Sequence, residues 1–261
     1  MAVDRYAGAA RRWATGAALV YGPIARQIVA ISPHPLSGRT VLDSGAGTGV
    51  ASAALADLGA RTVATDFSHQ MMSWDAGARP PAAVADIRAL PLVTDAVDDS
   101  VAAFVLNHLV DPATGFAELK RVTRPGGTLL AGVFGNAGRS HARDLVDETA
   151  RRAGWREPDW YLELKAGATP ILGTAAEMAR TATAAGLTVA VADERAVDVG
   201  VTEPEQLVDY RLGQANFAAW LTQMGPERTD EVRRQAIEVV RPVMRPYRPI
   251  VVFLVALIPE D

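Results

Sequence analysis

The sequence predicts an α/β fold with a doubly wound, mostly parallel sheet, and three features of its first half predict it. A short apolar strand runs directly into a turn that holds Gly45, Gly47 and Gly49, and an alanine-rich helix follows. A second strand ends in an acid, Asp66, which lies 21 residues after Gly45. Apolar strands and amphipathic helices then alternate as far as residue 134. This order is typical of βαβ units, whose strands lie parallel.

The composition indicates a packed domain and excludes several kinds of site. The chain has 261 residues, of which 49% are hydrophobic and 21% charged, so we expect a single domain with a sizeable core. It contains no cysteine, which excludes disulfides, thiolate metal sites and cysteine nucleophiles. The net charge is −4 and no long basic run occurs, so we expect no nucleic-acid partner.

The chain also lacks the sequence patterns of membrane and secreted proteins. The longest apolar run, Ile250 to Ile258, has nine residues, which is too short to span a bilayer and is typical of a buried strand. The first 13 residues carry charges but no apolar signal-peptide core. We therefore expect a cytoplasmic protein with no membrane partner. The oligomeric state, including a homodimer, is left open.

The N-terminal residues 4–31 are predicted to form one or two helices with a break near Gly22-Pro23. Apolar and aromatic residues, Trp13 and Tyr21 among them, recur there at helical spacing. Such a helix could pack on the core, or it could form a cap over a ligand with Tyr21 reaching that ligand. The sequence leaves both interpretations open.

The glycine turn after the strand at 40–44 suits a ligand that lies close to the backbone. Glycine reaches positive φ at little cost and has no Cβ to keep a ligand away. The helix that follows presents free N–H groups and a partial positive charge at its start. The dinucleotide fingerprint G-x-G-x-x-G would need a third glycine where the chain has Val50, which opposes an NAD-dependent oxidoreductase.

The strand at 61–66 places Asp66 beside that turn. An acid about 20 residues after the first glycine can accept hydrogen bonds from both hydroxyls of a ribose. NAD and S-adenosylmethionine (SAM) both carry such a ribose, so Asp66 indicates a nucleoside cofactor without choosing between them. Ser68 is then a plausible N-cap for a helix that contains Met71.

The next elements continue the alternation. We expect strands at 82–85, 98–105 and 128–134 and a helix at 112–122, with the sharp turn Arg124-Pro125-Gly126-Gly127 before the last of these strands. Beyond residue 135 we expect helices at 143–152 and 174–185, a loop over 155–175 and strands at 187–199 and 250–258. Three helical stretches, 203–212, 217–224 and 226–244, separate the last two strands.

Four ordered segments resemble the class I SAM-dependent methyltransferases, which have a Rossmann-like fold. The order Asp43-x-Gly45-x-Gly47-x-Gly49 resembles motif I of that family, and Asp86-x-x-x-Leu90-Pro91 looks like its D-x-x-x-L-P element. The segment after the fourth strand and the pattern L-x-R-V-x-R-P-G-G-x-L-L over residues 119–130 are also similar. The resemblance covers residues 40–134 and is of the UbiE-like, small-molecule type.

The resemblance implies the cofactor, SAM, with S-adenosylhomocysteine (SAH) as its product, and a seven-stranded sheet whose last strand runs antiparallel. It implies that Asp86 faces the adenine amino group, and that the backbone carbonyls of Ala103 and Phe104 face the cofactor's amino group. The residues that we expect to bind the cofactor are Asp43, Gly45, Ala46, Gly47, Asp66, Phe67, Met71, Asp86, Ile87, Ala103, Phe104 and Tyr21.

The expected organisation is a single methyltransferase domain in three parts. Residues 1–35 would form an N-terminal helical cap, residues 36–135 the SAM-binding core, and residues 136–261 the substrate-binding half. A helical insertion at about 203–245 would act as a lid.

The acceptor side is predicted less fully. His108 is the first candidate for a general base, because it follows a central strand at its carboxyl end, and His141 is the second. His108, Trp160, Tyr210 and Trp220 are candidates for contact with a small-molecule acceptor, although aromatic residues at helical spacing also form cores. We see no cluster of metal ligands.

The function predicted on these grounds is transfer of a methyl group from SAM to a small molecule, most simply as an O-methyltransferase of bacterial secondary metabolism. N- or C-methylation stays open. So does a SAM-binding protein of the same fold that performs non-methylating chemistry such as cyclisation, since a fold fixes the location of a site but not its chemistry.

Overall fold

A seven-stranded sheet with the order β3-β2-β1-β4-β5-β7-β6 forms the centre of the computed structural model, which describes residues 4–260. β1 pairs in parallel with β2 and β4, and β7 runs antiparallel to both β5 and β6. The predicted fold and the antiparallel last strand are confirmed. The strands are β1 Thr40–Ser44, β2 Arg61–Asp66, β3 Ala82–Val84, β4 Asp99–Ala103, β5 Thr128–Phe134, β6 Thr188–Ala196 and β7 Ile250–Leu257.

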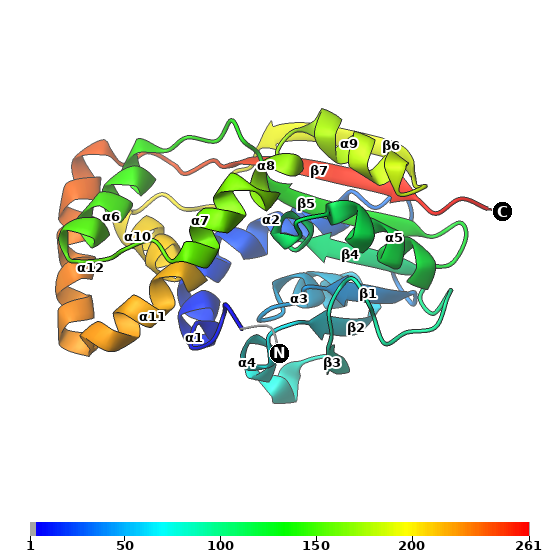
Figure 1. Ribbon diagram of the computed structural model, residues 1–261, viewed down its shortest axis with the longest axis horizontal. Helices are drawn as coiled ribbons and strands as arrows, with labels where there is room; N and C mark the ends of the chain where they lie inside the picture. The colour runs from blue at the N-terminus through cyan, green and yellow to red at the C-terminus, as the bar shows by residue number, and fades with distance from the viewer. Residues whose placement is uncertain (1–3, 261) are drawn as a thin grey trace.

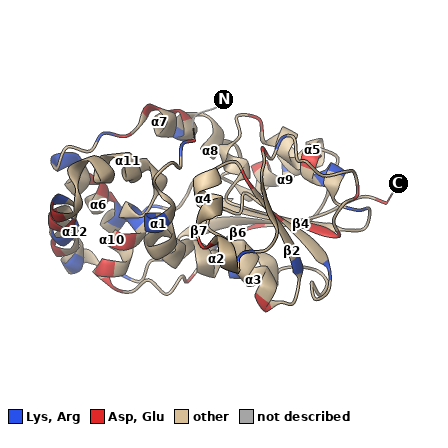
Figure 2. Cartoon of the chain, turned by 90° about the horizontal axis from the view of Figure 1, so that it is seen from below, with Lys and Arg blue, Asp and Glu red and all other residues tan. Residues whose placement is uncertain are grey.

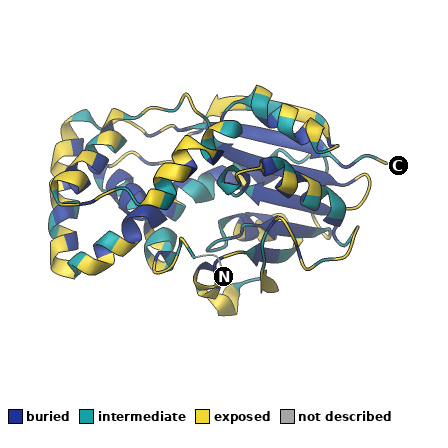
Figure 3. Ribbon diagram, in the orientation of Figure 1, coloured by how far each residue is buried: buried dark blue, intermediate teal, exposed yellow. Residues whose placement is uncertain are grey.

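Helices cover both faces of the sheet, because alternate side chains of the central strands point to opposite faces and are apolar on both. On β4, Val101 belongs to one buried cluster and Ala102 to the other. The first face is covered by α2 (Ala18–Ala30) and α3 (Val50–Asp57), and the second by α5 (Pro112–Val122) and α9 (Ala175–Ala184). Figure 3 shows the strands as the most buried part of the molecule.

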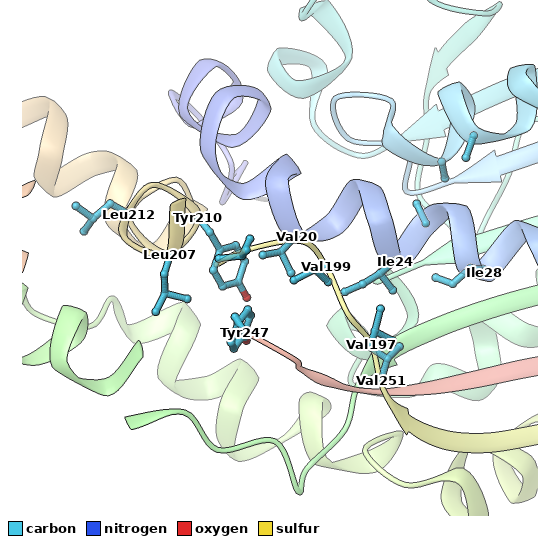
Figure 4. Close-up of a cluster of buried hydrophobic side chains, with 14 of the residues drawn as sticks. Val20, Ile24, Ile28, Val197, Val199, Leu207, Tyr210, Leu212, Tyr247 and Val251 are labelled. Atoms are coloured by element: carbon cyan, nitrogen blue, oxygen red, sulfur yellow. The ribbon is translucent and has the colours of Figure 1, made fainter. Parts of the chain in front are cut away.

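One side of α2 forms the contact with the sheet. Val20, Ile24 and Ile28 are spaced four residues apart and are fully buried. Figure 4 shows Ile24 opposite Val197 and Val251, where β6 ends and β7 begins, and Val20 beside Val199, whereas Ile28 packs on Gly132 of β5. This row fixes the N-terminal segment of the chain against strands that come from its C-terminal third.

A second body of helices lies beyond the carboxyl ends of the parallel strands, on the left of Figure 1. It is built from segments that are far apart in the sequence. Its helices are α1 Ala10–Arg12, the π-helical turn η1 Trp13–Ala17, α6 His141–Arg152, α7 Asp159–Ala166, α10 Pro204–Leu212, α11 Ala215–Met224 and α12 Pro226–Val240, the last followed by the 3-10 turn η4 Arg241–Val243. Short elements complete the chain: α4 His69–Ser73, η2 Ala76–Ala78, η3 Leu106–His108 and α8 Ala168–Ile171.

Two expectations about this region are wrong. The helix does not break near Gly22-Pro23, because α2 runs through Pro23. Proline removes only one N–H from the helix, and the buried row on α2 holds the segment straight through that position. The irregularity lies earlier, at η1. The stretch 155–175, expected to be a loop, contains α7 and α8, and Leu164 anchors α7 by being buried.

Two glycines allow η1 and α10 to approach each other closely. A Cβ on Gly16 would lie 2.2 Å from the carbonyl oxygen of Asp209, and a Cβ on Gly213 would lie 2.6 Å from the backbone nitrogen of Ala17. No ordinary side-chain contact is that short, so only glycine permits the observed packing. The backbone of η1 forms a π-helical turn, which is wider than an α-helical turn, at the place where α10 contacts it.

We predict that Gly16→Ala lowers the free energy of unfolding by about 1–3 kcal/mol, because the methyl group must push α10 away from η1. Gly22→Ala on α2 is the matched control. Its Cβ would meet nothing closer than the Arg26 guanidinium at 4.0 Å, and alanine favours a helix interior by about 1 kcal/mol over glycine. Urea denaturation followed by circular dichroism measures both. Equal stability of Gly16→Ala and wild type would contradict the packing described here.

Candidate functional site

The turn between β1 and α3 has the backbone that its glycines predicted. Gly45, Gly47 and Gly49 have φ values of +77°, +52° and +98°. These angles lie in the left-handed region, which other residues adopt only under strain. A Cβ on Gly45 would lie 2.4 Å from the Cβ of Val105, so the turn also packs directly on the segment that follows β4.

Asp66 lies at the end of β2 and holds this turn in place. The parallel pairing of β1 with β2 brings the two strand ends together. One oxygen of the Asp66 carboxylate, Oδ2, accepts a hydrogen bond from the backbone N–H of Gly47 at 2.8 Å, and Oδ1 accepts one from the N–H of Ser68 at 2.7 Å. Each oxygen has a second lone pair that a ribose hydroxyl could use. The predicted acid therefore lies where a ribose site needs it.

Asp43 lies beneath the turn and is fully buried. Its Oδ2 accepts a hydrogen bond from the Ser52 hydroxyl at 2.6 Å, whereas Oδ1 has no partner within residues 4–260. Burial raises the pKa of Asp43 to about 6. A buried carboxylate oxygen without a partner is costly, and it is the type of acceptor that an ammonium group or a bridging water would satisfy. The residues present thus fit the amino-acid end of SAM.

Arg79 braces the turn from outside, and the sequence analysis missed it. Its Nη2 donates to the carbonyl oxygen of Gly47, and its Nη1 donates to the carbonyl oxygens of Met71 and Met72, each at 2.9 Å. Burial lowers the pKa of Arg79, against the raising effect of Asp43 and Asp66. Because Arg79 lies in an irregular stretch with no motif, only the observation of an arginine close before the third strand could have indicated it.

The remaining predicted cofactor residues surround the same turn. Met71, Ala46 and Ile87 are buried, whereas the side chain of Phe67, directly after β2, is about half exposed. Asp86 is half-buried and forms an ion pair with Arg88 at 2.5 Å, and the hydrogen bond from that guanidinium lowers the pKa of Asp86. Ala103 ends β4, and Phe104 has a φ of +62°, a strained conformation for an aromatic residue.

The N-terminal segment passes over this site. The Ser68 hydroxyl donates to the Asp4 carboxylate at 2.7 Å, and the backbone N–H of Gly8 donates to the Gln70 side chain at 2.5 Å. The Tyr6 hydroxyl lies 3.3 Å from Nε2 of His108. These three contacts attach the first residues of the described chain to α4 and to the segment after β4.

A cavity of about 590 Å³ lies beside the glycine turn, between the sheet and the helical body. His108, His141, Trp160, Tyr21 and Tyr210 line it, so the structure brings both candidate bases together with three of the predicted aromatic residues. Trp220 is not part of the lining and instead packs near Phe217, with ring centroids 6.5 Å apart. The glycine turn itself does not line this cavity.

The two histidines differ in environment. His141 is exposed at the start of α6. His108 is half-buried, and burial, with a smaller effect of the Arg5 charge, lowers its pKa to about 4. His108 is therefore neutral at physiological pH, with Nε2 next to the Tyr6 hydroxyl. Burial also raises the pKa of Tyr6, so that hydroxyl keeps its proton.

Comparison with known proteins identifies the core. A family model described as a methyltransferase domain matches residues 42–131, the segment that runs from the buried β1 strand to the middle of β5. This segment contains the glycine turn, Asp66 at the end of β2, and the parallel strands β1 to β4 described above. Residues 42–131 form a class I SAM-dependent methyltransferase domain.

A relative supports the assignment of this methyltransferase domain. The demethylmenaquinone methyltransferase of Paenarthrobacter aurescens is 34% identical over 148 residues, which are 56% of this chain and 54% of that protein. The chain thus spans about half the length of the curated relatives that it matches. The similarity supports the methyltransferase core and leaves much of the helical body unmatched.

Solved structures show the same fold around this methyltransferase domain at low identity. A Haloferax volcanii protein solved with the Trm112 methyltransferase activator superposes with a TM-score of 0.63 at 20% identity, covering 100% of both chains. The [4+2]-cyclase SpnF gives 0.58 at 18% identity and covers 92% of this chain and 81% of its own. Phosphoethanolamine N-methyltransferase 2 of Haemonchus contortus, solved with SAH, gives a TM-score of 0.59 at 17% identity and covers 99% of this chain and 61% of its own.

No helix within residues 4–260 is both long and apolar enough to cross a membrane.

We predict that the imidazole of His108 titrates near pH 4 in the folded protein. Its ring signal in a histidine-selective NMR titration should keep the neutral chemical shift through pH 5. The His108→Gln variant assigns the signal by removing it. A midpoint close to the ordinary histidine pKa of about 6.5 would contradict the buried environment described here.

The same shift predicts a pH dependence of stability. The pKa of His108 is lower in the folded protein than in the unfolded chain, so the unfolded chain takes up the proton first as the pH falls. Stability is unaffected by this group above about pH 6.5 and declines as the pH falls toward 4, by roughly 3 kcal/mol in full. The difference in unfolding free energy between wild type and His108→Gln, measured from pH 7 to pH 4, should follow this course. A difference that does not change with pH would oppose it.

Proposed function

We propose that this chain transfers a methyl group from SAM to a small-molecule acceptor held in the cavity beside the glycine turn. The observation that carries the proposal is the arrangement of two carboxylates, the fully buried Asp43 and the half-buried Asp66, around a glycine turn, together with a cavity of about 590 Å³ between the sheet and the helical body. One carboxylate fits an amino group and the other a ribose, which together are the polar ends of SAM. The matched methyltransferase domain spans both residues.

The chain's own residues divide the work between binding and exclusion of water. Bound SAM supplies an electrophilic methyl group, so the protein needs chiefly to align the acceptor with it. Alignment of two reactants can lower the barrier by about 7–11 kcal/mol. Asp66 and Arg79 fix the turn, and Tyr21, packed edge-on against Phe104 with centroids 4.8 Å apart, separates the turn from the cavity. The contacts of Asp4, Tyr6 and Gly8 close the outer side.

We propose an acceptor oxygen as the methylated atom, with His108 as the base that takes its proton. His108 lines the cavity and follows β4 closely, and its lowered pKa keeps the ring neutral at pH 7, so a ring nitrogen can accept a proton as a weak base. The neighbouring Tyr6 hydroxyl orients the ring. His141 lines the same cavity from α6 as a second candidate.

We also propose that residues 4–35 and the insertion at about 203–245 act as a cap and lid over the acceptor; residues 1–3 of the predicted cap lie outside the described residues. α10 and the segment around Tyr247 provide cavity walls, and η1 packs closely on α10. The family model ends at residue 131, so this helical body lies outside the region that the family shares. This supports an acceptor particular to this chain, as expected for an enzyme of bacterial secondary metabolism.

Titration with SAH tests the cofactor part of the proposal. Asp66→Ala should weaken SAH binding by at least about tenfold in isothermal titration calorimetry, because a hydrogen bond to a charged group is worth about 1.5–3 kcal/mol. Asp57→Ala is the control, since Asp57 is an exposed acid at the end of α3. Asp66→Asn, which keeps an acceptor oxygen, should weaken binding less than Asp66→Ala. Equal affinity of Asp66→Ala and wild type would refute the ribose role.

Incubation with methyl-labelled SAM and an extract of the source organism tests the transfer. Label in a small-molecule product supports methyl transfer, whereas SAH binding without any labelled product supports the non-methylating alternative. With an acceptor identified, His108→Gln should lower kcat by about 10²–10⁴-fold if the methylated atom is a hydroxyl oxygen. The exposed His69→Gln should leave kcat unchanged. An unchanged rate in His108→Gln would exclude His108 as the base.

A further inference from the structure

The described lining of the acceptor cavity carries positive charge and no negative charge. Neither aspartate nor glutamate occurs in it, whereas six cationic side chains do: Arg139, Arg143, Lys165, Arg211, Arg245 and Arg248. The cavity's tyrosines do not offset this charge, because burial raises the pKa of Tyr21 and Tyr210 and keeps them neutral. The protein as a whole has a net charge of −4, and both signs of charge appear on outer helices such as α12 (Figure 2). The cationic character is therefore local to the cavity.

Three of the six cations are already paired with carboxylates. Arg211 makes two hydrogen bonds to Asp147, at 2.6 and 2.8 Å. Lys165 pairs with Glu157 at 2.9 Å, and Arg248 pairs with Asp198 at 3.0 Å. These pairs leave Arg139, Arg143 and Arg245 without a carboxylate partner within residues 4–260.

Arg143 differs from the other two because it is withdrawn from solvent. Arg139 and Arg245 are exposed, whereas Arg143 is half-buried on the first turn of α6. Its Nε atom is fully buried and has no hydrogen-bond partner in the described chain. Asp147, the acid of the same helix that affects the pKa of Arg143, is occupied by Arg211, and Arg151 approaches the same carboxylate to 4.0 Å. A buried guanidinium without a counter-charge is costly and calls for an anion from outside the chain.

A second unpartnered donor lines the same cavity. Asn216, at the start of α11, is only 4% exposed, and its Nδ2 atom has no hydrogen-bond partner among the described residues. Its backbone carbonyl accepts a hydrogen bond from Trp155 at 3.1 Å, which fixes its position. Buried amide groups nearly always have partners, so an orphan in a cavity wall indicates a polar ligand group.

A row of aromatic rings separates Arg143 from the cofactor side. Phe104 contacts Tyr21, Tyr21 contacts Tyr210, and Tyr210 contacts Tyr247, with centroid distances of 4.8, 6.3 and 5.6 Å. Figure 4 shows Tyr210 and Tyr247 pointing toward each other from α10 and from the segment before β7. After burial, Tyr247 and Tyr210 are among the groups that affect the pKa of Arg143, which places both tyrosines near its guanidinium. Arg143 thus lies at the end of the row that is remote from Phe104.

We propose that the acceptor carries an oxyanion, a carboxylate or a phosphate, which Arg143 binds at the end of the cavity remote from the methyl donor. Arginine suits this role because its planar fork can donate two parallel hydrogen bonds to a carboxylate or phosphate. The tyrosine and tryptophan side chains of the walls would hold a flat body between the oxyanion and the methylated atom. The inference rests on the proposed function and specifies the acceptor class for the same site.

The test compares matched probes in the presence of saturating SAH. 4-Hydroxybenzoate, phenyl phosphate and the neutral 4-hydroxybenzamide are titrated into the protein by isothermal titration calorimetry. Wild type should bind one or both anions at least about tenfold more tightly than the amide, as expected for a charge-assisted pair of hydrogen bonds. Preference for benzoate indicates a carboxylate acceptor, and preference for phenyl phosphate a phosphate acceptor.

The variants identify the residue responsible. Arg143→Gln should abolish the preference for the anion, and Arg143→Lys should retain part of it, because lysine keeps the charge without the fork. Arg152→Gln, on the solvent side of the same helix, is the control and should bind all three probes like wild type. Circular dichroism and SAH affinity, expected to be unchanged in all variants, show that the fold and cofactor site are intact.

The outcomes separate this inference from the proposed function. Equal binding of anion and amide to wild type overturns the inference, as does absence of saturable binding by both anions, or a full preference that survives in Arg143→Gln. SAH affinity decides the other question: wild type that fails to bind SAH contradicts the proposed function itself. Wild type that binds SAH without preferring an anion contradicts only the oxyanion site.

Discussion

The site depends on one arrangement: two carboxylates, the fully buried Asp43 and the half-buried Asp66, lie at a glycine turn beyond the carboxyl ends of parallel strands. Asp66 accepts the N–H of Gly47, and Asp43 lies fully buried below the turn with one oxygen unpartnered. Burial raises the pKa of Asp43, the charge of Asp66 adds to this effect, and the charge of Arg79 opposes it. The energetic cost of burying these groups is consistent with a ligand that carries a positive charge and hydroxyl groups, because such a ligand would satisfy them.

The strand order makes this arrangement available to the rest of the molecule. Strands β1 to β3 are added toward one edge of the sheet, and β4 and β5 are added on the other side of β1. Open α/β sheets bind ligands at such a switch point, which here lies between β1 and β4. The helical body then lies over the same edge (Figure 1), so the acceptor cavity forms between the sheet and helices from both ends of the chain. The close contact of η1 with α10 through Gly16 and Gly213 links the N-terminal and C-terminal parts of that body. A disturbance of this contact would therefore reach the cavity through Tyr210 on α10.

The cofactor half could be read from the sequence because its determinants are local. The glycines require positive φ wherever they lie, and the distance from Gly45 to Asp66 is set by the length of one βα unit. The predictions of secondary structure were wrong where tertiary packing decided the structure against the local sequence pattern. Pro23 suggested a break, but the buried row of Val20, Ile24 and Ile28 keeps α2 continuous. The helices in 155–175 were missed because Pro158, Gly167 and Pro170 interrupt the stretch, and Leu164 is the one buried residue of α7.

The sequence by itself determined the fold class and the succession of strands along the chain, because short spacings encode them, and its resemblance to a known family indicated the cofactor. The tertiary structure alone decided the acceptor side. It placed Tyr6 beside His108, lowered the pKa of that histidine through burial, and removed Trp220 from the cavity wall. It also left Arg143 without a counter-charge, because Asp147 pairs with Arg211 from a helix 64 positions away in the chain. Charge compensation depends on which side chains meet after folding, and no spacing in the sequence records it.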